Sequence, residues 1–138
     1  MDITWLGNNS FQINDEIINV IVNPTDKTVD QSSISDNTVF ICTDLNNSFE
    51  TKLAKVDSPG EYEINNASIH GIANAVRNND NKHISTCYRI ESRGLSTSIV
   101  GTIGSSFDSE ALSVLASSHI VVFSPDNNNI DAEILANT

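Results

Sequence analysis

The sequence predicts a β-rich α/β domain built in layers. Nine or ten segments have the β-branched, aromatic or alternating composition of strands, and segments with helical spacing gather towards the carboxyl end of the chain. Residues 57–101 predict neighbouring antiparallel strands joined by short turns. The length of 138 residues favours one domain, which we expect to span residues 1–138.

The first part of the chain predicts four strands. Residues 2–7 and 10–14 flank a short polar turn, as the two strands of a hairpin do. Residues 17–23 are β-branched and nearly all apolar, which is typical of a central strand, and Pro24 ends the run. After a polar loop, residues 38–43 form another apolar run that predicts a buried strand.

The middle of the chain is less regular at its start. Residues 48–56 fit one or two helical turns or an irregular segment. The expected order after it is a Pro-Gly turn and strand at 57–65, a strand at 67–74, a turn at 78–83, and strands at 84–92 and 95–101.

The clearest helix begins near Asp108. Asp108 is an N-cap residue type, and Glu110 stands in the first turn, where the helix dipole favours an acid. Apolar residues between positions 111 and 116 then follow helical spacing. Residues 119–125 predict a strand, and residues 129–137 predict a second short helix.

Charge and hydropathy exclude several classes of function. Eighteen acidic residues face seven Lys and Arg, for a net charge of −11, so the chain repels phosphate backbones and anionic lipid. We therefore expect no nucleic-acid and no membrane partner. The sequence contains no run of about 18 apolar residues and starts without the basic region of a signal peptide, which predicts a cytoplasmic protein.

The cysteines and histidines form no recognisable catalytic or metal motif. Cys42 and Cys87 each stand alone in an apolar run, which is typical of buried thiols. His70, His83 and His119 are far apart in the sequence, and none belongs to an H-x-H or H-E-x-x-H pair.

The order of several motifs resembles the metallo-β-lactamase-fold hydrolases, in the small bacterial lactonase-like branch. The family typically opens with W-L-G-H, ends its second central strand in Asp-Pro, carries a His-x-His-x-Asp-His metal motif after a buried strand, and then has Gly-Pro-Gly-Glu-Tyr-Glu. The matching segments, which cover almost the whole chain in order, are ITWLGNNSFQI, INVIVNP, TVFICTDLNNSF, DSPGEYEINNASIHGIA, GLSTSIVGTIGS and IVVFSPDNNNIDAEIL.

The resemblance implies an αββα sandwich with metals at one edge, between two sheets. Because the family's last metal-ligand His would follow a further strand, the chain is similar to a truncated form of this sandwich. The positions that correspond to the family's ligands carry Asn8, Asp44, Asn46, Ser48 with its neighbour Phe49, and Thr102.

These replacements predict that the metal chemistry is lost. Of the corresponding residues only Asp44 could bind a metal directly, because amide oxygens such as those of Asn8 and Asn46 are poor zinc ligands. We therefore expect no cofactor, no metal and no catalytic residue. Asn8, Asp44, Asn46, Ser48 and Thr102 are then vestigial site positions.

The sequence leaves three functions open. The first is a catalytically inactive pseudoenzyme that acts as a structural or interaction module. A truncated sandwich exposes a sheet edge or an apolar face, so this hypothesis predicts a homo-oligomer or a complex with a related full-length chain. The alternatives are a small-molecule-binding module that keeps the old cleft, and a metal-dependent hydrolase whose altered site uses Asp44.

Overall fold

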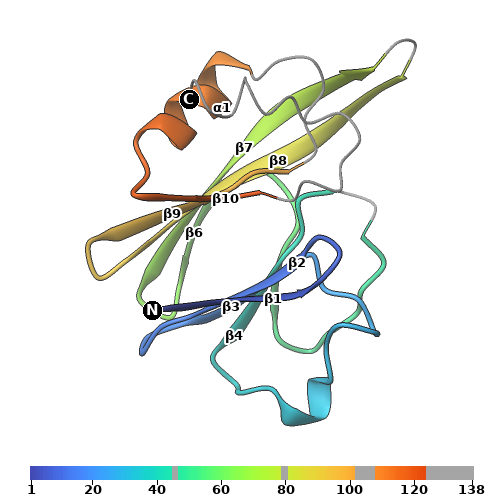
Figure 1. The fold of residues 1–138 in the computed structure, drawn as a ribbon, viewed down its shortest axis with the longest axis vertical. Helices are drawn as coiled ribbons and strands as arrows, with labels where there is room; N and C mark the ends of the chain where they lie inside the picture. Colours follow the sequence, from blue (N-terminus) through green and yellow to red (C-terminus); the bar gives the residue numbers. More distant parts are fainter. Residues whose placement is uncertain (45–46, 79–80, 102–107, 124–138) are drawn as a thin grey trace.

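Two five-stranded sheets face each other in a computed structural model of the chain (Figure 1). The structure describes residues 1–44, 47–78, 81–101 and 108–123, and for residues 75–78 and 81–83 it describes the backbone only. The layered, β-rich α/β fold that the sequence predicts is confirmed within these residues, which form two mixed sheets and one α-helix.

The first sheet is formed by the amino-terminal part of the chain. Its strands follow one another in sequence order: β1 (Asp2–Gly7), β2 (Ser10–Asn14), β3 (Asn19–Val22), β4 (Thr38–Ile41) and β5 (Ala54–Val56). β1, β2 and β3 are antiparallel neighbours, whereas β3, β4 and β5 are parallel. Parallel neighbours bring the carboxyl ends of β3 and β4 to the same edge of the sheet.

The second sheet contains the antiparallel series that the sequence predicts. Its order is β10 (Ile120–Val122), β9 (Leu95–Ile99), β8 (Asn81–Ser92), β7 (Ala67–Asn78) and β6 (Gly60–Ile64). β10 runs parallel to β9. The connection between them contains α1 (Ser109–Ala116), whose N-cap is Asp108, as predicted.

Strand periodicity determines which side chains enter the core. In β3, Val20 and Val22 point between the sheets and Ile21 points outwards, and β4 follows the same rule. Tyr88 and Ile99 meet them from the second sheet, and all these residues are buried. Both apolar central strands thus contribute to a single inter-sheet core, because each exposes alternate residues to it.

The outer faces of the two sheets are covered differently. α1 packs against β7 and β8 on the second sheet (Figure 1). On the first sheet, Ile21 and Phe40 are covered by side chains from two connecting loops, which include Ile34 and Phe49. Within the described residues, this outer layer contains only the 3₁₀ turn Gln31–Ser33, so the helical layer is present on one face of the sandwich.

Two expectations about local structure are revised, and a third is not tested. Residues 48–56 were expected to be helical or irregular, but their last three residues form β5 because they align with β4 at the sheet edge. The bounds expected for the turn at 78–83 are too wide, since β7 continues to Asn78 and β8 begins at Asn81, and these two residues pair with each other. The helix expected at 129–137 lies outside the described residues.

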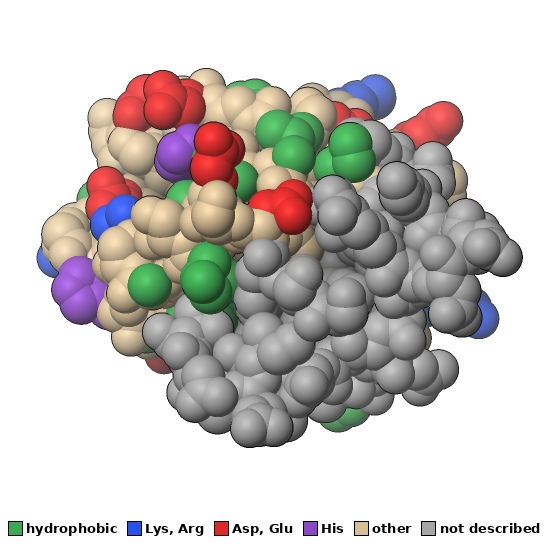
Figure 2. Space-filling model, turned by 90° about the horizontal axis from the view of Figure 1, so that it is seen from above, with side chains coloured by type: hydrophobic (Ala, Val, Ile, Leu, Met, Phe, Trp, Pro, Cys, Tyr) green, Lys and Arg blue, Asp and Glu red, His purple; other side chains and the backbone are tan. Residues whose placement is uncertain are grey.

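The surface carries its acidic side chains in separate groups. Figure 2 shows them dispersed among polar side chains on one face of the molecule. Both cysteines are buried and free, as the sequence predicts. Among the described residues, no helix combines the length and the apolar character needed to cross a bilayer.

Candidate functional site

The turn between β1 and β2 places Asn8 at the edge of the first sheet. Gly7 (φ 118°) and Asn8 (φ 48°) have positive φ angles, which Gly and Asn tolerate better than other residues. The carbonyl of Asn8 accepts a hydrogen bond of 2.9 Å from Trp5 Nε1, and the residue is exposed. The conformation of the turn therefore accounts for an Asn at this position.

Asn23, which sequence reasoning missed, joins three strand ends. It has a φ of 49°, and its Oδ1 accepts hydrogen bonds from Thr43 N at 2.9 Å and from Thr43 Oγ1 at 3.1 Å. Its own N–H donates to Ile41 O at 2.7 Å, and its Nδ2 lies 3.5 Å from the carbonyl of Asn9. The available sequence signal was an Asn-Pro pair directly after a buried strand.

The end of β4 is hydrogen-bonded to the opposite sheet. Thr43 O accepts from Thr86 N at 2.8 Å and from Ser85 Oγ at 3.3 Å, and Asp44 forms an isolated bridge with Ser85. One residue earlier, Cys42 O accepts from Tyr88 Oη at 2.9 Å. The edge at which the family resemblance places metals is therefore an edge where the two sheets contact each other directly.

Gly101 lies very close to Thr43 and Ser85 at this edge. A Cβ added to Gly101 would collide with Ser85 Oγ and would lie 3.0 Å from Thr43 Cβ and from Thr86 O. Real Cβ atoms are rarely this close to backbone or to a short buried side chain. The space next to the end of β4 is thus filled by the protein itself.

Residues 47–49 form a compact turn after β4. Asn47 Oδ1 accepts from Phe49 N at 2.8 Å, and Lys55 Nζ donates to Phe49 O at 2.7 Å. The Phe49 ring packs against Phe40, with 4.9 Å between ring centroids, whereas Ser48 is exposed. Burial of Phe49 anchors the turn and leaves Ser48 at the surface.

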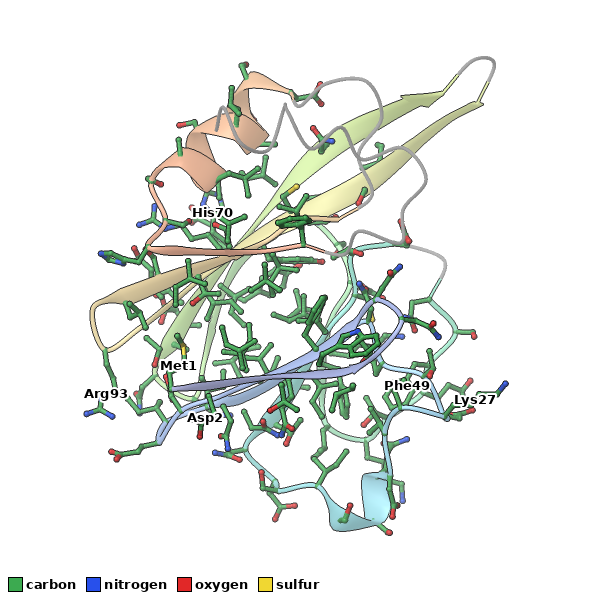
Figure 3. The ribbon with its side chains drawn as sticks, viewed as in Figure 1. Met1, Asp2, Lys27, Phe49, His70 and Arg93 are labelled. Carbon is green, nitrogen blue, oxygen red and sulfur yellow. The ribbon has the colours of Figure 1, made fainter. Side chains whose placement is uncertain are left out.

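An open cavity of about 530 Å³ lies beside these turns. It is lined by Asn8 and by residues 24–27 and 47–49. Figure 3 shows that Lys27 extends away from the body of the molecule, while Phe49 lies nearer the sheet. The cavity therefore has a polar rim made of three different strand connections.

The predicted site positions are only partly brought together. Asn8 and Ser48 line the same cavity, whereas Asp44 is half-buried at the end of β4 and is not among the lining residues. Asn46 and Thr102 lie outside the described residues. The structure therefore joins two of the five positions in one cavity.

The buried titratable groups next to the site stay neutral at ordinary pH. Burial raises the pKa of the Cys42 thiol to about 11 and also raises the pKa of Cys87. Burial likewise raises the pKa of Tyr88, whose hydroxyl bonds Cys42 O. Because a thiolate or phenolate is needed for nucleophilic attack, these groups do not act as nucleophiles near pH 7.

The two histidines whose side chains are described do not join the site. His119 Nδ1 accepts from Ser96 N at 3.0 Å, which fixes the start of β10 against β9. On the second sheet, His70 Nε2 lies 3.9 Å from Glu61 Oε1. Figure 3 shows His70 well separated from Phe49 and Lys27. Within the described part of the chain, no group of three or more His, Cys, Asp or Glu is arranged to hold a metal ion.

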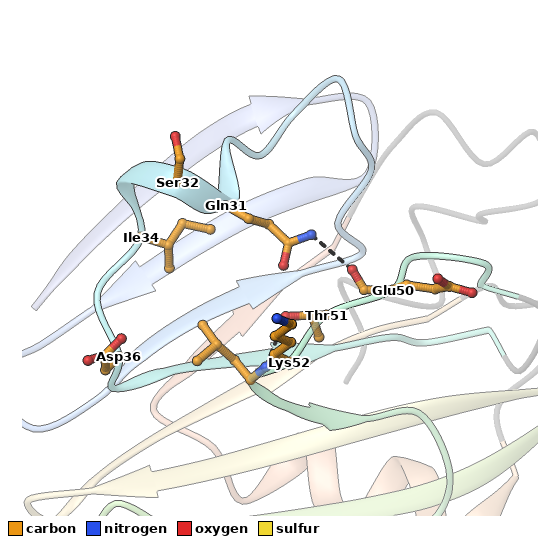
Figure 4. Close-up of a pocket in the computed structure, with 8 residues that line it drawn as sticks. Gln31, Ser32, Ile34, Asp36, Glu50, Thr51 and Lys52 are labelled. Carbon is orange, nitrogen blue, oxygen red and sulfur yellow. Dashed lines mark hydrogen bonds between the residues drawn. The ribbon is translucent and has the colours of Figure 1, made fainter.

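A second cavity lies on the outer face of the first sheet. It measures about 650 Å³ and is open, and Figure 4 shows it between the segments 31–36 and 50–53. Gln31 Nε2 donates to Glu50 O at 2.9 Å across it. It contains none of the predicted site positions, so it provides no link to the family's catalytic edge.

Comparison with known proteins supports the architecture. A family model described as a beta-lactamase superfamily domain matches residues 2–130. A proposed zinc-dependent hydrolase of the metallo-β-lactamase superfamily from Thermotoga maritima is similar in structure, with a TM-score of 0.57 and 22% identity over 80% of this chain and 54% of that one. No curated protein sequence matches the chain.

A second solved structure is similar at lower identity. Zn²⁺-bound PqqB from Methylobacterium extorquens has a TM-score of 0.54 and 8% identity, over 83% of this chain and 59% of that one. At these identities the likeness concerns the fold alone. The chain spans a little over half the length of either solved structure.

Proposed function

We propose, since the chain belongs to the metallo-β-lactamase superfamily, that it is a catalytically inactive member serving as a structural or interaction module. The observation that carries this proposal is the chemistry of the side chains at the strand ends. Asn8 and Ser48 offer an amide and a hydroxyl, and Asp44 is the only carboxylate of the predicted set. A hydrolytic zinc site needs several imidazole or carboxylate donors and an open position for water.

The hydrogen bonds at this edge support the same proposal. The carbonyl of Thr43 and the hydroxyl of Ser85 bond to each other, and Asn23 Oδ1 is occupied by two donors from Thr43. Polar groups at this edge thus hold strand ends together, which is a structural task. The donor set does not fit a di-zinc centre, and we derive no catalytic step through one.

The metal content of the purified protein tests this proposal. Protein prepared without chelator and analysed by elemental mass spectrometry should contain well below one equivalent of zinc, iron or manganese per chain. About one equivalent, lost in the variant Asp44→Ala, would instead support the hydrolase with an altered site. Metal retained by Asp44→Ala would place the ion elsewhere in the chain.

A small-molecule-binding module is the second candidate, and the cavity of about 530 Å³ is the observation that favours it. Asn8 and Ser48 line this cavity together, so the old site region keeps a concave surface although its donors are neutral. The mixed rim, which includes Asp26 and Lys27, favours small polar ligands with both hydrogen-bond donors and acceptors.

A thermal-shift screen distinguishes this second candidate. Probes should include free amino acids, monosaccharides and dicarboxylates, because a compound that binds only the folded state raises the melting temperature. The matched control is Ser48→Trp, which fills the cavity from an exposed position. A shift in the wild type that disappears in Ser48→Trp would support binding there, and a shift retained by the variant would exclude this cavity.

A further inference from the structure

The described part of the two sheets has four edge strands, and three of them are protected against pairing with another chain. β5 and β10 are only three residues long, and β5 carries Lys55. β6 follows Pro59 and carries the exposed acids Glu61 and Glu63. Short length, charge and proline are the usual features that keep a sheet edge from recruiting further strands.

β1 lacks these protections. It is six residues long, and residues 2–5 are all exposed. Ile3 is 42% exposed and Trp5 is 66% exposed, which is unusual for large apolar side chains on a regular strand. Its one charged residue, Asp2, stands at its beginning, as Figure 3 shows. The register shift at Trp5–Gly7 comes at the far end, so residues 2–5 remain in regular register with β2.

The exposed apolar side chains of β1, Ile3 and Trp5, point to the inner face of the sheet. Ile3 is opposite Ile13 and Trp5 is opposite Phe11, and Ile13 belongs to the inter-sheet core. Because only three residues connect β5 to β6, those two edges share one side of the sandwich, and β1 and β10 share the other (Figure 1). Among the described residues, β10 is too short to cover the inner face of β1, and Ile3 and Trp5 are exposed there.

We propose that β1 pairs antiparallel with β1 of a second copy of this chain, so that the two first sheets become one continuous sheet. The inference rests on the proposed function as an interaction module and names its partner and surface. The pairing is centred on Thr4, which faces Thr4 of the second copy. Ile3 then lies opposite Trp5 in both directions, and Asp2 lies opposite Leu6.

The sequence of β1 is self-complementary in this register, which is why we choose a second copy as the occupant. Aromatic side chains opposite β-branched ones, and Thr opposite Thr, are favourable cross-strand pairs. No carboxylate faces another carboxylate across the two-fold axis, and the exposed Ile3 and Trp5 of both copies form one apolar stripe. The interface is isologous, so pairing stops at two chains.

Long-range charge opposes this dimer and gives it a recognisable salt dependence. Each copy carries a net charge of −11, so two copies repel each other until salt screens the repulsion. The dimer should therefore become tighter as sodium chloride is added. An assembly held together by ion pairs would become weaker under the same change.

A cysteine placed on the two-fold axis tests the register. In Thr4→Cys, the two new thiols face each other across antiparallel strands, where Cα atoms are about 4.5–5.5 Å apart and a disulfide can form. In the control Asp2→Cys, the thiols are four residues out of register, on the order of 13 Å apart along the strands. The native Cys42 and Cys87 are buried and do not compete.

Mild oxidation of both variants, followed by non-reducing electrophoresis and mass spectrometry, should give a covalent dimer at least about tenfold faster for Thr4→Cys than for Asp2→Cys. Equal rates, or no covalent dimer from Thr4→Cys, would overturn the proposed pairing. Both variants are surface changes on an exposed strand, and a urea melt of each confirms that the chain is folded.

Sedimentation equilibrium tests whether the apolar stripe drives association. Ile3→Lys should weaken the dimer at least about tenfold, because the interface loses a buried side chain. Leu112→Lys is the matched control, since Leu112 is 40% exposed on α1 and makes the same change of charge. A wild type that is monomeric at micromolar concentration, or equal weakening by both variants, would refute the proposal.

The metal content of the same sample separates the two proposals. A monomer without metal refutes the pairing and leaves the inactive assignment in place. A dimer that contains about one equivalent of catalytic metal supports the pairing and refutes the inactive assignment.

Discussion

Replacing Asn23 by Ala should destabilise the protein strongly, although Asn23 is not in the apolar core. Asn23 holds the end of β4 by accepting two hydrogen bonds from Thr43, one from its backbone N–H at 2.9 Å. Thr43 is buried, so loss of the acceptor leaves a buried donor unsatisfied, which costs about 1–3 kcal/mol. The φ of 49° adds about 1 kcal/mol for any residue with an ordinary Cβ.

Two further substitutions separate these costs. Asn23→Gly removes the acceptor but tolerates the positive φ, so it should lose about 2 kcal/mol, against about 3 kcal/mol for Asn23→Ala. Asn23→Asp keeps an Oδ1 acceptor and tolerates the conformation, so its loss should be below about 1 kcal/mol. The expected order of stability is therefore Asp above Gly above Ala.

Urea unfolding followed by tryptophan fluorescence provides the assay, since Trp5 is the single tryptophan. All variants must be compared at one protein concentration, because self-association would make stability depend on concentration. The slope of the transition should be unchanged. If Asn23→Ala unfolds within about 0.5 kcal/mol of the wild type, the reasoning that Asn23 organises the strand ends is wrong.

Two other perturbations address the same region. Gly101→Ala should lower the free energy of unfolding by about 1–3 kcal/mol, because the new Cβ would collide with Ser85 Oγ. In the double variant with Ser85→Ala, part of this loss should be recovered. If urea unfolding shows that the losses of the two single variants simply add, the close approach of Gly101 to Ser85 is contradicted. The pKa of Cys42 rises from 9.0 to about 11 on folding, so above pH 9 the unfolded chain loses a proton that the folded chain keeps. This thiol should therefore leave the free energy of unfolding unchanged below pH 9 and should lower it between pH 9 and 11. The decline should be less steep in Cys42→Ala. If the wild type and Cys42→Ala lose stability in parallel over this range, burial of Cys42 is not the cause.

Much of the fold could be predicted because strand composition is a local property. The apolar, β-branched runs around Val20 and Val39 and the turn residues of the antiparallel series were sufficient to place most strands. β5 was missed because a three-residue strand such as Ala54–Val56 has no periodicity to detect, and only its neighbour β4 makes it a strand. The outer end of the β7–β8 ladder was missed because polar residues near Asn78 resemble a wide turn.

For the candidate site, too, one part could be predicted from the sequence and another part could not. The sequence alone determined which donor chemistry is available, since amide and hydroxyl groups replace imidazoles at the expected positions whatever the fold does with them. Only the tertiary structure decided that Asn23 binds Thr43, that the end of β4 contacts β8, and that β1 is the unprotected edge. The physical reason is distance along the chain. The chemistry of a side chain is a property of the single residue, whereas contacts such as Thr43 with Ser85 join residues far apart in the sequence and depend on how the two sheets pack.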